Sequence, residues 1–289
     1  MTSEMTNDAS SFEDRLLPVG DHHLHIRRGG TATALPSFVL EAGGGSILSS
    51  WSTLEQALAP HGRVLAYERA GIGDSSGPVD SVGAEAVAQR LATLLSATQT
   101  QTPVILVGHS LGGLYARYVA ATRPGLVAGL VLLDSTPTDL PFPRFYSVKP
   151  TLAMWLLHAV ARIGLLERIA GRGKLPPSLI AAIGRYRHIR TVLTEIGALR
   201  EVQAEVGAIA LPDRLPVLAL SAGARTLEPQ AQRDHFHASH AQIAAAARAP
   251  HSRHQRIDGA THMSMLTDPQ HAASVAGLIV AFAQGIASS

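Results

Sequence analysis

The sequence contains no cysteine, which excludes disulfides, thiolate nucleophiles and cysteine-based metal sites. Charged residues make up only 16% of the 289 residues and aromatic residues only 4%. The formal net charge is +2, and no dense block of lysine and arginine interrupts the chain. We therefore expect no nucleic-acid partner, since such proteins carry a concentrated basic patch. Because a chain without cysteine fits a reducing compartment, the expected location is the cytoplasm.

Uninterrupted apolar runs long enough to span a membrane are also missing, so we expect no stable membrane insertion. The first residues are polar and acidic and lack the apolar centre of a signal peptide. Residues 1–11 are expected to form a disordered tail. The hydrophobic content of 46% is nevertheless sufficient for a large core.

From residue 12 onward, apolar runs alternate with helical patterns. A turn at Gly20 and Asp21 joins two short strands and predicts an opening hairpin. Later strands, such as 103–109, 126–134 and 215–223, are apolar throughout and are separated by amphipathic helices. This pattern predicts an α/β fold in which a mostly parallel central sheet carries helices on both faces.

The alternation breaks once, between about residues 138 and 211. This segment begins with a proline-rich stretch and continues as helices without a strand. We interpret it as a helical cap at 138–211, inserted into a core formed by 12–137 and 212–289. An ordinary helical layer of the same core is the alternative interpretation.

The most informative motif is Gly108-His109-Ser110-Leu111-Gly112, which lies directly between an apolar strand and a helix. A sharp strand-to-helix turn strains the backbone of its central residue, and glycines on either side remove Cβ atoms that would collide. Such a turn exposes a serine hydroxyl as a nucleophile. The motif alone is weak, because a tight turn or a phosphate-binding loop can have the same pattern.

A serine needs a base, and a base needs an orienting carboxylate. His262 follows the last predicted strand, which is the expected chain position for the base. Asp134 lies at the carboxyl end of a strand and is the preferred acid, because sites gather beyond these ends. Glu228 is the alternative acid, and Asp258 is a weaker third choice, because the Asp258-Gly259 pair is typical of a turn.

The remaining candidate site residues are backbone donors and pocket walls. The amides of Leu111 and Gly44 are the predicted oxyanion hole, with Gly43 as the nearest substitute. Three consecutive glycines let a bare backbone approach a substrate, although they could also form a flexible connector. Gly43, His109 and Trp155 are the predicted substrate-binding residues, with core packing as the alternative for Trp155.

No metal site is predicted. His235, His237 and His240 are close in the sequence, but the first two lie about 200° apart on a helix, and no glutamate completes a zinc-protease pattern. The histidines at 22, 23 and 25 fit a polar strand face better. No cofactor is implied by any motif.

Five pieces of the sequence resemble the α/β-hydrolase fold superfamily over about residues 16–286. In chain order they are "VLEAGGGSILSSW", "VLAYERAGIGDSSGP", "VILVGHSLGGLYAR", "GLVLLDSTP" and "DGATHMSMLTDP". The resemblance implies that Ser110 is the nucleophile and His262 the base, and Asp134 matches the acid of members that carry it after the sixth strand. Two positions depart from the pattern: Ala42-Gly43 replaces the usual His-Gly, and the usual acid after the seventh strand is absent.

These observations predict a serine hydrolase that acts on a small carboxylic ester through an acyl-serine intermediate. Other acyl chemistry on the same residues stays open, namely acyl transfer, lactone or C–C bond hydrolysis and cofactor-free perhydrolysis. A non-catalytic ligand sensor on this fold is the alternative from another class. The sequence leaves the natural substrate and the oligomeric state open.

Overall fold

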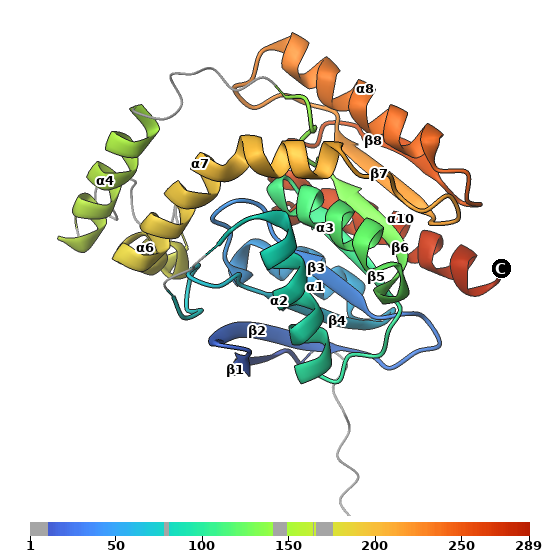
Figure 1. Ribbon diagram of the computed structural model, residues 1–289, viewed down its shortest axis with the longest axis horizontal. Coiled ribbons are helices and arrows are strands. Elements are labelled where there is room, and N and C mark those ends of the chain that lie inside the picture. The colour runs from blue at the N-terminus through green and yellow to red at the C-terminus, as the bar shows by residue number, and fades with distance from the viewer. Residues whose placement is uncertain (1–10, 78–80, 141–148, 164, 166–175) are drawn as a thin grey trace, which may run out of the picture.

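An eight-stranded sheet, in the spatial order β1-β2-β4-β3-β5-β6-β7-β8, runs through the centre of the protein (Figure 1). The computed structural model describes residues 11–77, 81–140, 149–163, 165 and 176–289. The strands are β1 (Glu13–Val19), β2 (His22–Gly30), β3 (Phe38–Glu41), β4 (Arg63–Tyr67), β5 (Val104–His109), β6 (Val127–Leu133), β7 (Val217–Ala222) and β8 (Arg253–Ile257). β1, β2 and β4 pair antiparallel, and the pairs from β4 to β8 are parallel, so the predicted mostly parallel sheet is confirmed.

Helices cover both faces of this sheet, as the fold class requires (Figure 1). They are α1 (Ser52–Leu58), α2 (Ala84–Ala97), α3 (Leu111–Thr122), α4 (Lys149–Arg162), α6 (Pro177–Ile183), α7 (Tyr186–Gly207), α8 (Gln230–Ala246), α9 (Ser264–Thr267) and α10 (Pro269–Ala287). Two short 3-10 turns, η1 (Leu48–Ser50) and η2 (Pro124–Leu126), precede α1 and β6.

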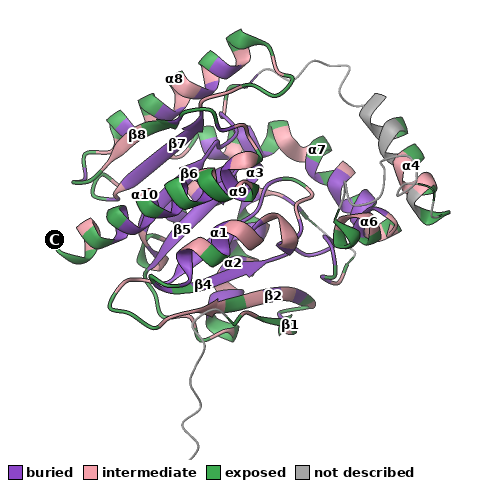
Figure 2. Ribbon diagram, turned by 180° about the vertical axis from the view of Figure 1, so that it is seen from behind, coloured by how far each residue is buried: buried purple, intermediate pink, exposed green. Residues whose placement is uncertain are grey.

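Side chains of the parallel strands alternate between the two faces of the sheet. In β5, Ile105 and Val107 pack with α1 and α10, whereas Val104 and Leu106 pack with α2 and α3. Both sets are buried, as the continuous purple of the inner strands in Figure 2 shows. Because each face is covered, the strand has no solvent-facing position, which explains its uniformly apolar sequence.

The opening hairpin forms where the sequence predicts it. β1 pairs with β2 antiparallel, and Val19 lies opposite His22 across the turn. Gly20 adopts φ +57°, a conformation that glycine reaches without the steric cost of a Cβ. The hairpin then joins the parallel strands through β2 and β4, which places it at the edge of the sheet (Figure 1).

The helical segment predicted at 138–211 lies between β6 and β7 and contains α4, α6 and α7. Val202 and Val206 of α7 pack against Leu114 and Tyr115 of α3, so the carboxyl half of α7 is part of the core packing. α4 and α6 lie farther from the sheet, at one end of the molecule (Figure 1). The predicted tail apart from Ser11, and residues 141–148, 164 and 166–175 of the predicted cap, lie outside the described residues.

The terminal helix α10 is apolar enough and long enough to cross a membrane, alone among the helices in the described residues, with a mean hydropathy of 1.3 in its best window. In this fold its apolar face packs on the sheet. Val275, Ile279 and Phe282 are fully buried there, and Gly129 of β6 leaves room for the Phe282 ring. Asp268 caps the start of the helix by accepting from the amides of Gln270 and His271.

We expect Phe282→Ala to lower the free energy of unfolding by about 3–5 kcal/mol, because the truncation leaves a cavity between α10 and the sheet. Urea titration followed by circular dichroism measures the change. Leu227→Ala is the control, since that side chain is 95% exposed and its truncation should cost under about 0.5 kcal/mol. Equal effects of the two substitutions would contradict the assigned packing of α10.

Candidate active site

Ser110 lies at the turn between β5 and α3 in a strained backbone conformation, with φ +53° and ψ −123°. A non-glycine residue in this region costs about 1–3 kcal/mol and persists only where its surroundings impose it. Here the surroundings are glycines: a Cβ at Gly108 would lie 2.7 Å from the Gly112 carbonyl oxygen, and one at Gly112 would lie 2.2 Å from that of Glu41. The predicted reason for both glycines is therefore observed.

The carboxyl ends of β5 and β6 bring Asp134 beside Ser110. The strands pair in register, with His109 opposite Leu133. The amide of Ser110 donates to the carbonyl of Leu133 at 3.1 Å, and the amide of Thr136 donates to the carbonyl of Ser110 at 3.0 Å. Asp134 therefore sits in a loop that is hydrogen-bonded on both sides to the backbone of Ser110.

His262 reaches Asp134 from the loop between β8 and α9. Its Nδ1 donates to Oδ2 of Asp134 at 2.7 Å. This bond places the proton on Nδ1 of the neutral ring and leaves Nε2 as the basic nitrogen. Asp134 is fully buried, whereas the His262 side chain is about one third exposed. The geometry thus couples a buried carboxylate to an accessible imidazole.

The second oxygen of Asp134 is also occupied. Oδ1 accepts from NH1 of Arg233 at 2.6 Å and from the amide of Ala222 at 3.1 Å. Burial alone would raise the pKa of Asp134, but the hydrogen bonds and charges of His262 and Arg233 outweigh it and hold that pKa well below its usual range. The carboxylate therefore stays ionised at neutral pH and can stabilise a protonated His262.

Arg233 also binds Glu228, the alternative acid. Glu228 binds Nε and NH2 of Arg233 at 3.0 and 2.8 Å and accepts from the amides of Thr226 and Leu227. Asp134 therefore makes the contact with His262, and Glu228 binds the arginine that contacts Asp134. Arg233 was not predicted, because a single arginine in the polar sequence of α8 carries no local signal of its burial.

His109 is placed differently from its prediction as a substrate-binding residue. Its side chain is only 1% exposed, and Nε2 donates to the carbonyl of His262 at 3.1 Å. The two rings lie 4.4 Å apart, and Trp51 packs edge-on against His109. Burial, together with the neighbouring His262, lowers the pKa of His109 to about 3, so its ring is neutral. His109 therefore binds the backbone of the His262 loop from the buried side.

The described ring contacts of Trp155 are with residues of the insertion and not with Ser110, Asp134 or His262. Its ring packs against His158 and Tyr186, at centroid distances of 5.8 and 5.4 Å. These three residues belong to α4 and α7, so Trp155 holds helices of the insertion together. The core-packing alternative fits this position better than a substrate contact.

The glycine loop after β3 lies against the serine turn. A Cβ at Gly43 would lie 3.2 Å from Cβ of Ser110, and one at Gly44 would lie 3.5 Å from Cδ2 of Leu111. The structure therefore places both predicted donor segments, 43–44 and Leu111, next to each other at the Ser110 turn. β3 neighbours β5 in the sheet, with Glu41 opposite Gly108, which is why these loops meet.

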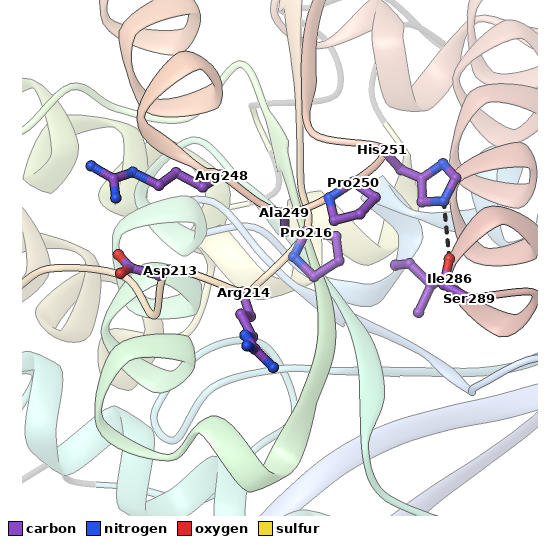
Figure 3. Close-up of a pocket in the computed structure, with 9 residues that line it drawn as sticks. All are labelled: Asp213, Arg214, Pro216, Arg248, Ala249, Pro250, His251, Ile286 and Ser289. Atoms are coloured by element: carbon purple, nitrogen blue, oxygen red, sulfur yellow. Dashed lines mark hydrogen bonds between the residues drawn. The ribbon is translucent and has the colours of Figure 1, made fainter.

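Two surface cavities lie apart from these residues. One, of about 520 Å³, includes Pro216, Arg248 and His251 among its walls (Figure 3). Pro216 and His251 come just before β7 and β8, so this cavity opens at the amino ends of the strands. The other, of about 700 Å³, lies between α3, α8 and residues 209–213. Ser110, Asp134 and His262 line neither of these two cavities.

One group of metal-ligand side chains occurs among the described residues, formed by His25, Glu68 and Asp74 with ligand atoms within 4.8 Å of one another. These atoms are already engaged. Glu68 accepts from the amides of Leu48 and Asp74 and contacts Nδ1 of His25, and Asp74 binds Arg185 at 2.8 Å. The group thus fixes the loop after β4 and is a poor fit for a metal ion.

Comparison with known proteins agrees with the fold. A family model described as the alpha/beta hydrolase family matches residues 38–274. The chain belongs to this family. The match runs from the first buried strand to α10 and includes Ser110, Asp134 and His262.

Similarity to individual proteins is moderate. The chain is 30% identical to a pimeloyl-acyl-carrier-protein methyl ester esterase of Xanthomonas campestris over 246 residues, which covers 80% of this chain and 89% of the relative. It is 35% identical to RutD of Serratia proteamaculans, described as a candidate carbamate hydrolase, over 121 residues. That alignment covers 41% of this chain and 45% of RutD, so the chain spans less than half of that relative.

Solved structures share the fold at lower identity. Cfl2 from Burkholderia cenocepacia superimposes with a TM-score of 0.72 at 23% identity, covering 92% of this chain and 95% of that one. At this identity the similarity concerns the fold alone.

The pairing of Arg233 with Asp134 predicts a pH-dependent loss in Arg233→Met. At pH 7 the free energy of unfolding should fall by about 3–5 kcal/mol, because a buried carboxylate loses its partner. A carboxyl group whose pKa is lower in the folded than in the unfolded protein stabilises the fold at pH values above its unfolded pKa, which is about 3.9 for aspartate. This stabilisation is lost as the pH falls through the pKa of the folded state. The difference from the unsubstituted protein should therefore shrink below about pH 4.

Urea midpoints at pH 7, 4 and 2.5 measure this dependence. Arg123→Met is the control, because Arg123 pairs with the exposed Glu85 and its removal should cost about 1 kcal/mol or less. A loss in Arg233→Met that is equal at all three pH values would contradict the link to the ionisation of Asp134.

Proposed function

We propose that the protein hydrolyses small carboxylic esters through an acyl-serine intermediate. The observation that carries the proposal is the 2.7 Å bond between His262 and the buried Asp134, in a loop bonded to the backbone of the strained Ser110. The methyl ester esterase relative supports the substrate class, since it is similar over most of both chains.

In the proposed acylation step, Nε2 of His262 accepts the proton of Ser110 Oγ as this oxygen attacks the ester carbonyl carbon. The carbonyl π electrons move to the oxygen, and the amides of Gly44 and Leu111 donate hydrogen bonds to the resulting oxyanion. When the tetrahedral intermediate collapses, the ester C–O bond breaks, and His262 returns its proton to the leaving alkoxide. The products are an alcohol and an acyl-serine.

Deacylation repeats these steps with water. His262 removes a proton from a water molecule as the water oxygen attacks the acyl carbon. When the tetrahedral intermediate collapses, His262 gives that proton to Ser110 Oγ, and the carboxylic acid is released. Asp134 stabilises the imidazolium in both steps, and Arg233 keeps Asp134 ionised without reaching the substrate. The mechanism uses only groups of this chain, and we propose that the enzyme acts without a cofactor.

The insertion between β6 and β7 is the proposed cap. α7 contacts the glycine loop through Val192, which lies close enough that a Cβ at Gly45 would be 2.8 Å from its Cγ2. A segment in this position adjoins the site and can limit the size of the acyl group. For the location, we infer the cytoplasm from the lack of cysteine.

Ser110→Ala should abolish turnover of p-nitrophenyl esters, because no other side chain at this turn can form the acyl intermediate. The release of p-nitrophenol measures the rate, and an unchanged circular dichroism spectrum shows that the fold is intact. Turnover that survives in this variant would remove Ser110 from the mechanism.

Asp134→Asn should lower kcat by about 10⁴-fold, because an asparagine cannot stabilise the imidazolium and favours the wrong tautomer of His262. Glu228→Gln is the matched control, since it changes the alternative acid by the same chemistry. It should retain kcat within about tenfold, because Glu228 binds Arg233 and not His262. The reverse order of the two effects would assign the acid role to Glu228.

A further inference from the structure

A buried arginine lies behind the glycine loop that would bind the oxyanion. Arg69 follows β4 and is only 6% exposed. Its NH2 donates to the carbonyl of Gly43 at 2.9 Å, and its NH1 donates to the carbonyl of Ala42. One guanidinium therefore donates hydrogen bonds to two consecutive carbonyls of the loop.

These two hydrogen bonds determine the direction of the amides of Gly43 and Gly44. In a planar trans peptide, the N–H of one residue is antiparallel to the carbonyl of the preceding residue. The carbonyls of Ala42 and Gly43 face Arg69, so the amides of Gly43 and Gly44 face away from it. The same two residues are the ones packed against Ser110 and Leu111.

A second buried side chain holds the loop from the insertion. Glu195 of α7 is 2% exposed, and its Oε1 accepts from Nε of Arg69 at 2.7 Å. Its Oε2 accepts from the amide of Gly45 at 3.1 Å. Glu195 thus engages the Gly45 amide and fixes Arg69, while the amides of Gly43 and Gly44 stay directed away from this pair.

The rest of the environment fixes the arginine in one orientation. NH1 of Arg69 also donates to Glu41 at 2.7 Å, and Tyr67 donates to the other oxygen of Glu41. The guanidinium carbon lies 5.2 Å from the centre of the Tyr115 ring on α3. Because these contacts need a planar fork of several donors, lysine cannot replace this arginine.

We infer that Arg69 and Glu195 are positioning residues that orient the oxyanion-binding amides of Gly43 and Gly44. Because Glu195 belongs to α7, the docking of the insertion completes the oxyanion hole as well as covering the site. The kinetic part of this inference rests on the proposed ester hydrolysis, whereas the orientation of the loop does not.

The test uses Arg69→Lys and Glu195→Gln in the full-length protein. Each should lower kcat for a p-nitrophenyl ester by about 10- to 100-fold with KM within about threefold, less than the 10²–10³ of losing a donor outright. Binding of a trifluoromethyl ketone, whose hemiketal oxyanion uses the same amides, should weaken by a similar factor. The pH dependence of kcat/KM should keep its midpoint, because His262 is untouched.

Glu205→Gln is the matched control for Glu195. Glu205 lies on the same helix, and its Oε2 accepts from the amide of Ala84 at 2.7 Å, so it also ties α7 to the core by a carboxylate–amide bond. It should retain kcat and inhibitor binding within about threefold. Equal losses in Glu195→Gln and Glu205→Gln would overturn the inference in favour of a general docking effect.

Hydrogen–deuterium exchange separates this inference from the proposed function. Peptides covering residues 42–46 should exchange faster in Arg69→Lys and Glu195→Gln and at the unsubstituted rate in Glu205→Gln. If the unsubstituted protein hydrolyses no ester and binds no ketone, the proposed function fails, and exchange still decides the positioning role. Unchanged exchange of this loop in both variants would overturn that role.

Discussion

The register between β5 and β6 is the constraint on which the site depends. Parallel pairing of His109 with Leu133 makes the two strands end together, so Ser110 and Asp134 leave the sheet side by side. Pairing of Glu41 with Gly108 adds the glycine loop on the other side of β5. Since parallel strands end at the same edge of a sheet, the loops after β3, β5, β6 and β8 converge there, and no single loop forms the site alone.

Close backbone contact maintains this convergence. Gly112 lets α3 begin against the carbonyls of Glu41 and Ala42, and Gly113 lets it pass Ser135, next to Asp134. The strained conformation of Ser110 follows from this crowding. Its free-energy cost is offset by the packing of the sheet and its helices, which holds the turn in this conformation.

Two buried charge networks support the site from opposite sides. Arg233 with Glu228 stabilises the ionised Asp134, and Arg69 with Glu195 fixes the glycine loop. Each network joins the core to a helix distant in sequence, α8 in the first case and α7 in the second. Buried charges of this kind are costly unless fully paired, so they favour one arrangement of the loops over its alternatives.

The sequence predicted the fold class, and its motifs indicated Ser110, Asp134 and His262. In the structure His262 contacts Asp134, and the loop of Asp134 is hydrogen-bonded to the backbone of Ser110. These residues carry local signals: Ser110 and Asp134 directly follow apolar strands, and His262 lies in the loop between β8 and the terminal helices. Arg69, Arg233 and Glu195 carry no local signal, because Glu41, Asp134 and Arg69, which they respectively bind, lie more than 25 positions away. The motif around His109 likewise does not reveal that its ring is enclosed by Trp51 and the His262 loop.

The central claim is that a nucleophilic Ser110 is activated by His262 and Asp134. Labelling with a fluorophosphonate, followed by mass spectrometry of the peptides, tests it most directly, because only an activated serine reacts with this reagent at low concentration. We predict one adduct, on the peptide that contains Ser110, with labelling lost in His262→Ala. An unlabelled protein, or an adduct on a different residue, would contradict the account.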